Sequence, residues 1–273
     1  MVILLVNSFT IKTYASDVED NDRTDNEDPI IMVSLGDSYS SGKGIEKFYG
    51  QDDDTSVKIN NPDWLAHRSQ NSWSGMPHLT DLDGTMASHK DENWFFVAAS
   101  GAVTDNLLNV FEKKYKKDGY EGSYSLEPQL NVIDQFDADT VDYVTLTFGG
   151  NDVGFSNIII TAVSDTWLAV PYLNPSKLSD NLNETWESFY AEEDSIKENI
   201  TNAYINIAER AGANADIIVA GYPKLLDQNG KGIHFTKKQA EQINSNVGRF
   251  NQALNEIVGS CSDSGMNIFI SSQ

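Results

Sequence analysis

The chain carries an apolar run that stops abruptly at a Gly-Asp-Ser tripeptide, and this break indicates the type of fold. Residues 30–35 read Ile-Ile-Met-Val-Ser-Leu, and mostly small residues then extend from Gly36 to Gly42. The pattern predicts a buried strand, a tight turn and the start of a helix. Backbone N–H groups are unpaired at such a helix start and can stabilise an anion. Ser38 lies in this turn and is therefore a candidate nucleophile.

Further apolar runs alternate along the chain with segments of helical periodicity. Strands are predicted at residues 93–100, 141–148, 216–221 and 266–271. Helices are predicted to start at Thr104 or Asp105 and at Glu127, and a longer one is predicted over residues 193–211. A capping box of Thr236 and Gln239 predicts the start of another helix. A short helix is also predicted whose buried face carries Trp73, Met76 and Leu79. This alternation indicates a parallel sheet covered on both faces, with ligands bound beyond the carboxyl ends of its strands.

Charge and composition exclude several classes of partner. The 273 residues have a net charge of −22, so nucleic acid and anionic membrane surfaces would be repelled. No stretch approaches the ~20 apolar residues of a membrane span, so stable membrane insertion is not expected. Cys261 is the single cysteine, which excludes an internal disulfide and a thiolate metal cluster, and we interpret it as a small buried residue. No histidine pair has metal-ligand spacing, so no metal or cofactor is expected.

The N-terminal residues predict export. Residues 1–16 combine an apolar stretch with a small-residue exit, as in a secretory signal, although a basic start is missing. The alternative is a frayed apolar N-terminus or a buried strand. Residues 17–29 are rich in Asp, Glu and Asn and are interpreted as a solvated acidic linker. A single domain is then expected over residues 30–273.

Three residues suited to acyl transfer follow three of the predicted strands. Hydrolysis of an ester through an acyl-enzyme needs an activated hydroxyl, a base and donors aimed at the developing oxyanion. Ser38 supplies the hydroxyl, and its N–H, the Gly101 N–H and the Asn151 side-chain amide are the candidate donors. Glycine permits close approach of the backbone, and asparagine donates without a titratable charge. Asp37 is expected to cap or brace the turn instead of serving as a triad acid.

The motifs around these residues resemble those of the SGNH, or GDSL-type, serine esterases and lipases. The matching blocks are residues 33–42 (VSLGDSYSSG), 98–104 (AASGAVT) and 145–155 (TLTFGGNDVGF), with His67-Arg68-Ser69 and Pro128-Gln129 also matching a secreted subgroup typified by streptomycete esterases. The resemblance covers the chain from Ile30 onward. It implies a flavodoxin-like three-layer α/β/α sandwich with about five parallel strands. It also implies metal-free hydrolysis with Ser38 as nucleophile and Gly101 and Asn151 as oxyanion donors.

The sequence departs from this family pattern at two places. The subgroup usually has disulfide cysteines where His67 and Ala99 stand, so the core alone is expected to hold this fold. The catalytic histidine of the family comes shortly after the final strand, whereas no histidine follows His234 here. We therefore expect a C-terminally incomplete domain, a homologue that has lost its base, or another histidine in that role. The chain as written is expected to show little or no turnover.

The four histidines differ in their suitability as a base. His234, just before a predicted helix cap on the side of the fourth strand, is the weak substitute candidate, and its alternative role is that of a loop or cap residue. His67 is interpreted as a packing residue. His78 and His89 are expected at the surface or at a helix cap.

The leading interpretation is a secreted serine esterase or lipase that cleaves small-molecule, lipid or carbohydrate esters through an acyl-Ser38 intermediate. The alternatives are a non-catalytic SGNH-like binding or surface module and a phospholipase or acyltransferase with the same site. Residues 156–190 are interpreted as a lid or acyl-binding wall, or as ordinary packing. Residues 113–122 are predicted to form a loop, and Asp52-Asp53-Asp54 to lie in a solvated acidic loop.

Overall fold

The computed structural model describes residues 29–45, 47–51, 61–79, 82–117, 120–154, 183, 186–187, 190–224 and 236–271. The predicted signal segment, the predicted linker up to residue 28, the Asp52-Asp53-Asp54 loop, His234 and most of residues 156–190 lie outside the described residues. The predictions for these segments, including the domain boundaries, therefore stay predictions.

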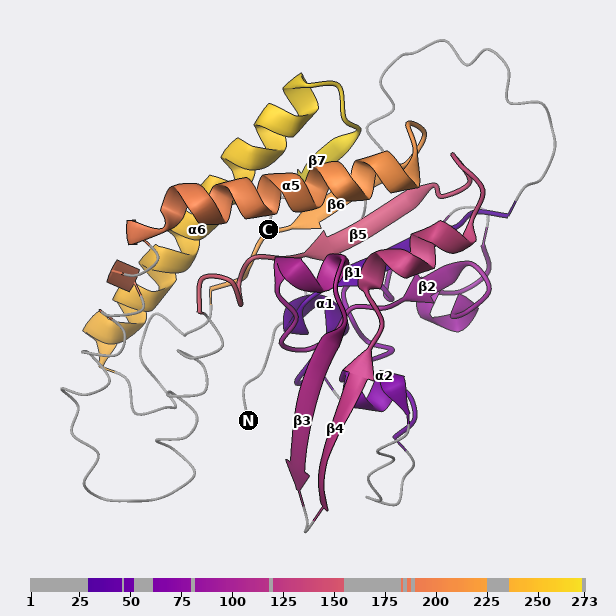
Figure 1. The fold of residues 1–273 in the computed structure, drawn as a ribbon, viewed down its shortest axis with the longest axis horizontal. Helices are drawn as coiled ribbons and strands as arrows, with labels where there is room; N and C mark the ends of the chain where they lie inside the picture. The colour runs from indigo at the N-terminus through magenta and orange to yellow at the C-terminus, as the bar shows by residue number, and fades with distance from the viewer. Residues whose placement is uncertain are drawn as a thin grey trace.

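A five-stranded parallel sheet forms the centre of the fold (Figure 1). In spatial order its strands are β2 (Trp94–Phe96), β1 (Met32–Gly36), β5 (Tyr143–Thr147), β6 (Asp216–Ala220) and β7 (Ile268–Ser271). Numbered by their succession along the chain, these strands have the order 2-1-3-4-5, which is the flavodoxin-like arrangement. The predicted fold class is confirmed.

Helices and short 3-10 turns connect the strands. The α-helices are α1 (Ser38–Ser41), α2 (Pro62–Leu65), α5 (Glu193–Ala211) and α6 (Lys237–Asp263), and the 3-10 helices are η1 (Met86–His89), η2 (Thr104–Leu107) and η3 (Gln129–Gln135). Within the described residues, no helix has the length and apolar character needed to cross a membrane.

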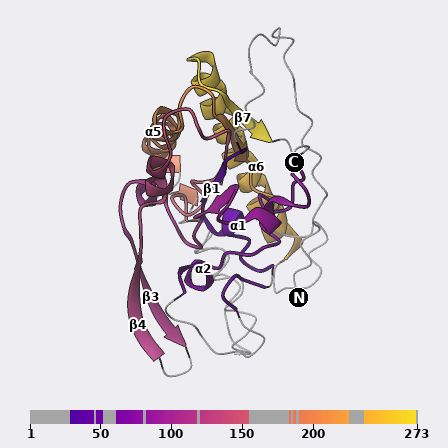
Figure 2. The same cartoon turned by 90° about the vertical axis from the view of Figure 1, so that its right-hand side faces the viewer.

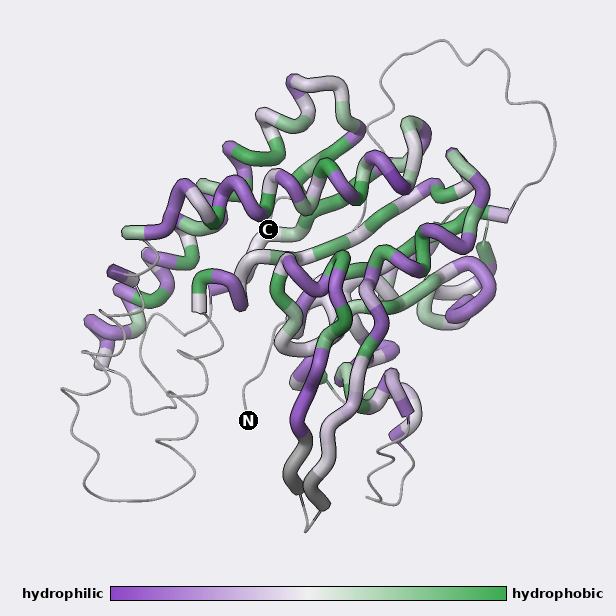
Figure 3. The backbone as a smooth tube through the Cα atoms, in the orientation of Figure 1, coloured by the Kyte–Doolittle hydropathy of each residue, from purple (hydrophilic) through white to green (hydrophobic). Residues whose placement is uncertain are grey.

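Alternate residues of β1 belong to two different apolar clusters. Val33 and Leu35 join the large cluster, which includes the buried sides of α5 and α6. Met32 joins a smaller cluster with Met86 and Trp94. Successive side chains of a strand point to opposite faces, so the sheet is covered on both of them. Figure 3 shows the hydrophobic residues concentrated along these strands and on one side of α5.

The two long helices have the predicted positions. Helix α5 spans the predicted residues, and its buried stripe includes Ile196, Ile200 and Ile207. Helix α6 begins after Thr236, whose Oγ1 accepts from the Gln239 N–H at 3.3 Å while its own N–H donates to Gln239 Oε1 at 2.9 Å. The predicted capping box is confirmed, and Cys261 is buried on α6 as expected.

The prediction of a loop at residues 113–122 is wrong. Strands β3 (Phe111–Lys117) and β4 (Tyr120–Leu126) form an antiparallel pair, with Phe111 opposite Leu126 and Lys113 opposite Tyr124. Figures 1 and 2 show this pair extending away from the central sheet. Phe111, Tyr124 and Leu126 lie on one face of the pair and pack against the large apolar cluster, and the run of lysines concealed that pattern. The Asp-Gly dipeptide at 118–119 is a hairpin signal in the sequence that could have found it.

Three of the predicted helices differ from the structure. The segment with Trp73, Met76 and Leu79 consists of turns and irregular chain, and Met76 is 43% exposed. Pro77 explains this difference, because a proline disfavours helical geometry in the residue before it. The helices expected from Thr104 and from Glu127 are the short 3-10 helices η2 and η3.

Candidate active site

The three candidate residues follow neighbouring strands. Strand β1 lies between β2 and β5, and Ser38, Gly101 and Asn151 come shortly after the carboxyl ends of β1, β2 and β5. The strand ends are linked by backbone hydrogen bonds, from Asp37 N to Thr147 O at 3.0 Å and from Ala99 N to Gly36 O at 2.9 Å. The structure therefore brings all three residues to one edge of the sheet. This edge includes the point where the strand order reverses, which is the usual ligand position in such sheets.

The turn at Ser38 depends on the residues that flank it. The Tyr39 N–H donates to Asp37 Oδ1 at 2.9 Å, so the predicted capping role of Asp37 is confirmed. Gly36 has a φ of +123°, and a Cβ there would lie 2.5 Å from Thr147 O. Only glycine fits this position. The Ser38 Oγ is half-buried and forms no hydrogen bond with the described residues.

The Asp37 carboxylate is 1% exposed and is held by three elements of the fold. Its Oδ1 accepts from Thr147 Oγ1 at 2.9 Å, and its Oδ2 accepts from the Tyr222 hydroxyl. The Tyr222 oxygen in turn accepts from the Gly150 N–H at 2.9 Å. Burial raises the pKa of Asp37 to about 6 although these hydrogen bonds oppose the shift. Asp37 therefore joins the Ser38 turn to the loop that carries Asn151.

A buried glutamine fixes the last residue of β1. Gln129 Oε1 accepts from the Gly36 N–H at 2.7 Å, and Gln129 Nε2 donates to Gly36 O at 2.9 Å. The Gln129 side chain thus satisfies both backbone groups of Gly36, as a neighbouring strand would. These contacts give a physical role to the Pro128-Gln129 motif.

The loops after β2 and β5 are tied together by side chains. Asn151 Nδ2 donates to Ala102 O at 2.8 Å, which orients the amide and leaves its second N–H for another acceptor. The next residue, Asp152, accepts from Thr104 Oγ1 at 2.6 Å and from the Thr104 N–H at 3.2 Å. Burial raises the pKa of Asp152. These contacts hold Asn151 against the Gly101 loop.

The backbone at Gly101 is open to a ligand. Gly101 is exposed and has a φ of +92°, which favours glycine. Within the described residues, the N–H groups of Ser38 and Gly101 have no hydrogen-bond partner. The site thus offers two backbone donors and one amide donor at the same sheet edge.

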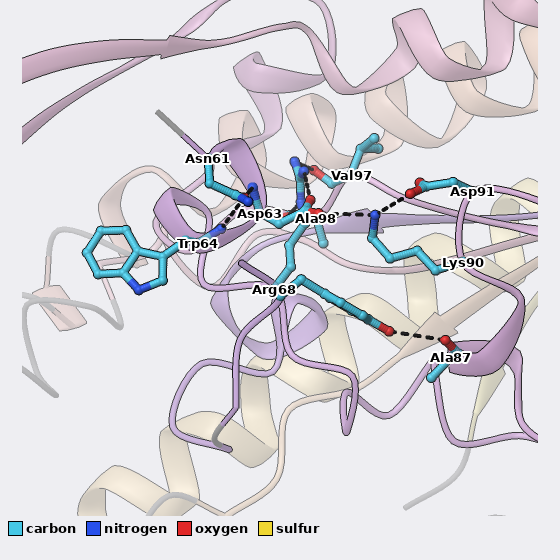
Figure 4. Close-up of polar contacts among 10 residues, drawn as sticks. Asn61, Asp63, Trp64, Arg68, Ala87, Lys90, Asp91, Val97 and Ala98 are labelled. Carbon is cyan, nitrogen blue, oxygen red and sulfur yellow. Dashed lines mark hydrogen bonds and ion pairs between the residues drawn. The ribbon is translucent and has the colours of Figure 1, made fainter. Parts of the chain in front are cut away.

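Arg68 supports the segment that leads to Gly101 (Figure 4). Its side chain is nearly buried, with Nε donating to Ala98 O and Nη2 to Val97 O, both at 2.9 Å. Its Nη1 pairs with Asp63 Oδ1 at 2.7 Å, and Lys90 pairs with the other oxygen of Asp63 at 3.0 Å. Arg68 matched a motif in the sequence, but its two carbonyl partners are visible only in the folded chain.

The described histidines have contacts that do not involve Ser38. His67 has a φ of +57°, and its ring lies 5.0 Å from the Phe48 ring between centroids, in keeping with the predicted packing role. His78 is exposed, and His89 Nε2 lies 2.6 Å from Asp83 O. None of the three forms a hydrogen bond with Ser38. His234 lies outside the described residues.

Metal ligands are not grouped in the part of the chain that the structure describes, since no three His, Cys, Asp or Glu side chains lie close enough to hold an ion. The arrangement of donors can stabilise an anion beside a serine hydroxyl without a cation.

Comparison with known proteins relates the chain to two solved structures. A phospholipase A1 from Streptomyces albidoflavus NA297 is 22% identical with a TM-score of 0.57, covering 88% of this chain and 78% of that one. An extracellular lipase from Streptomyces rimosus is 21% identical with a TM-score of 0.58, covering 88% of this chain and 80% of that one. No protein-family model and no curated protein matches the sequence. The chain therefore has the fold of these two Streptomyces proteins, which is the fold that the SGNH resemblance implies.

Proposed function

We propose that the chain is a serine ester hydrolase of the SGNH type, which cleaves carboxylic esters through an acyl-Ser38 intermediate. The observation that carries the proposal is the set of unpaired Ser38 and Gly101 N–H groups beside Asn151 at one sheet edge. The motif resemblance supports the same reaction. So does the fold shared with a lipase and a phospholipase A1.

In this mechanism Ser38 Oγ attacks the ester carbonyl carbon, and its proton passes to a general base. The carbonyl oxygen becomes an oxyanion that accepts from the N–H groups of Ser38 and Gly101 and from Asn151 Nδ2. Each donor contributes about 3 kcal/mol of transition-state stabilisation. The intermediate then expels the alcohol with a proton from the base, and water releases the acyl group by the same steps in reverse order.

None of the contacts described above supplies a general base for Ser38. The resemblance implies a histidine shortly after the last strand. Strand β7 is parallel to β1, so its carboxyl end lies at the same edge of the sheet as Ser38. His234 is the other candidate; it lies outside the described residues and falls between β6 and α6 in the sequence.

The substrate and the site of action follow from the same proposal. We infer a lipid or other small ester as substrate, because the two proteins of this fold are a lipase and a phospholipase A1. We infer secretion from the apolar N-terminal segment and from the neighbour described as an extracellular lipase. Acyl transfer to an alcohol instead of water would use the same residues.

A second candidate function is an SGNH-like binding module without turnover. The observation that favours it is the Ser38 Oγ, which has no hydrogen-bond partner among the described residues. A catalytic serine is activated by a base within hydrogen-bond reach, although such contacts are often longer without substrate.

Hydrolysis of 4-nitrophenyl butyrate with and without added imidazole separates the two functions. The enzyme hypothesis predicts hydrolysis that Ser38→Ala abolishes and Ser88→Ala, a matched change at an exposed serine, does not. If the protein has no base near Ser38, imidazole will supply one and raise the Ser38-dependent rate, which is the difference between the wild type and Ser38→Ala because imidazole also hydrolyses the ester by itself. A folded protein without Ser38-dependent hydrolysis in either condition would refute the esterase and favour the binding module.

A further inference from the structure

The hairpin strand β3 brings a lysine to the edge of the candidate site. Lys113 Nζ donates to the carbonyl of Ser100, the residue before Gly101. The ammonium also lies 5.6 Å from the centre of the Phe111 ring, and a Cβ on Gly101 would lie 3.6 Å from that ring. Lys113 is therefore a direct neighbour of the Gly101 loop. Figure 3 shows β3 changing from hydrophobic to hydrophilic along its length.

A second lysine approaches from the Ser38 side. Lys43 follows α1, and its backbone N–H donates to the carbonyl of Ser38 at 3.0 Å. Burial and, as the second cause, the charge of Lys43 lower the pKa of Lys113 to about 8. Burial also lowers the pKa of Lys43. Lys113, which is half-buried, and Lys43, which is exposed, thus come from different elements to the Gly101 side and the Ser38 side of the site.

Neither lysine has a carboxylate to balance it. Among the described residues, Lys43 and Lys113 form no ion pair. Other cations of this acidic chain do pair, as Arg68 does with Asp63 and Lys197 with Glu193. Two like charges on the two sides of one site repel each other, and a bound anion would relieve that repulsion.

We propose that Lys43 and Lys113 form a subsite for an anionic group, phosphate or carboxylate, carried by the ester substrate. This inference rests on the proposed function, since it assigns acidic esters as the substrate class of the same site. Lysine binds both groups as a compact point charge with three donors. Lys113 contacts Ser100, the residue before Gly101. The anionic group of the substrate would therefore lie only a few bonds from the ester carbonyl that the Gly101 N–H binds.

A matched pair of substrates tests the subsite. In 4-nitrophenyl hydrogen glutarate a carboxylate replaces the terminal methyl group of 4-nitrophenyl valerate. The ratio of their kcat/KM values should favour glutarate, and Lys113→Met or Lys43→Met should each lower that ratio about tenfold, as expected for a charged hydrogen bond. Lys114→Met is the control, because Lys114 is exposed and points to the other face of β3. A ratio equal in all four proteins would overturn the inference.

Binding of inorganic phosphate tests the subsite without catalysis. Calorimetric titration at constant ionic strength should show binding to Ser38→Ala that is lost when Lys113→Met is added and kept when Lys114→Met is added. Phosphate should also compete with the glutarate ester and not with the valerate ester, which ties the bound anion to the substrate position. Circular dichroism and urea unfolding confirm that each variant is folded.

The outcomes distinguish this inference from the proposed function. Ser38-dependent hydrolysis with lysine-independent substrate ratios would refute the subsite and leave the esterase intact. Lysine-dependent phosphate binding without Ser38-dependent hydrolysis would refute the esterase, and the pair would then be a site for free anions, not for a substrate group. Phosphate binding that is equal in all variants would refute the subsite outright.

Discussion

Around Ser38 the site is supported by buried hydrogen bonds within the sheet, whereas around Gly101 it is supported by cations. Asp37, Thr147 and Tyr222 hold the Ser38 turn from inside the core. Arg68 and Lys113 hold the Gly101 segment through its backbone carbonyls. Both sides position a backbone N–H, yet they do so with different chemistry.

The two kinds of support suit the two sides of the site to different tasks. On the Ser38 side, the supporting carboxylate of Asp37 is buried. The hydrogen bonds that hold the Ser38 turn therefore depend on whether Asp37 is protonated. On the Gly101 side, Gly101 is exposed and Lys113 is only half-buried, so the charge of Lys113 is available to a ligand. The first side is therefore suited to fixing the nucleophile, and the second to selecting the substrate.

Removing the nucleophile has the largest expected effect. Where a histidine base acts on Ser38, Ser38→Ala should lower kcat for 4-nitrophenyl butyrate at least about 10⁴-fold, because only the oxyanion donors and substrate binding then act on the ester. Initial rates with Ser88→Ala as control measure this effect. Retention of a tenth of the activity would mean that another residue attacks the ester.

Removing Asn151, the side-chain donor of the proposed oxyanion hole, has the second largest expected effect. Asn151→Ala should lower kcat about 10²–10³-fold with little change in KM, because the donor acts mainly on the transition state. Asn109→Ala, an exposed asparagine, is the control. A change confined to KM would assign Asn151 to substrate binding instead.

Removing the cation behind the Gly101 segment tests the charged side. Arg68→Met leaves Asp63 short of a partner and two carbonyls unpaired, so the free energy of unfolding should fall by about 4 kcal/mol. Arg68→Lys should recover only part of this loss, since one ammonium cannot replace the planar fork. Urea unfolding measures both. The half-exposed Arg210, paired with Asp134, is the control, and Arg210→Met should cost less than about 1 kcal/mol. Equal losses at the two arginines would contradict the supporting role of Arg68.

The buried carboxylate on the Ser38 side gives the smallest effect. The pKa of Asp37 in the folded protein, about 6, lies above its ordinary value of 3.8, so the folded state binds this proton more tightly. The associated stability is complete below about pH 4 and is lost as pH rises through 6, on the order of 3 kcal/mol in all. Asp37→Asn keeps a capping side chain and should remove this part of the pH dependence.

Urea unfolding of both proteins between pH 4 and 7.5 measures that difference. Comparing the wild-type and variant slopes isolates Asp37 from Asp152 and Asp216, whose pKa values burial also raises. Parallel pH profiles would show that Asp37 is not the group responsible.

The local parts of the fold could be predicted from the sequence. Helix α5, the cap at Thr236 and the strand before Ser38 depend on patterns within a few neighbouring residues. Asp37 was predicted as a cap for the same reason. Ser38, Gly101 and Asn151 follow strands whose ends must meet in a parallel sheet.

The distant partners could not be predicted in this way. Tyr222 is 185 residues from Asp37 along the chain, and no local pattern links a tyrosine to a buried carboxylate so far away. Its place directly after β6 was the available signal, since the other site residues also follow strands. Lys113 was missed because the hairpin that carries it was predicted as a loop.

The most direct test is a crystal structure of the protein after reaction with a fluorophosphonate in the presence of imidazole. We expect phosphorus bonded to Ser38 Oγ, with the phosphoryl oxygen about 2.7–3.1 Å from the backbone nitrogens of Ser38 and Gly101 and from Asn151 Nδ2. A folded protein that does not react at Ser38, or an adduct whose oxygen points away from these three donors, would contradict the proposed oxyanion hole.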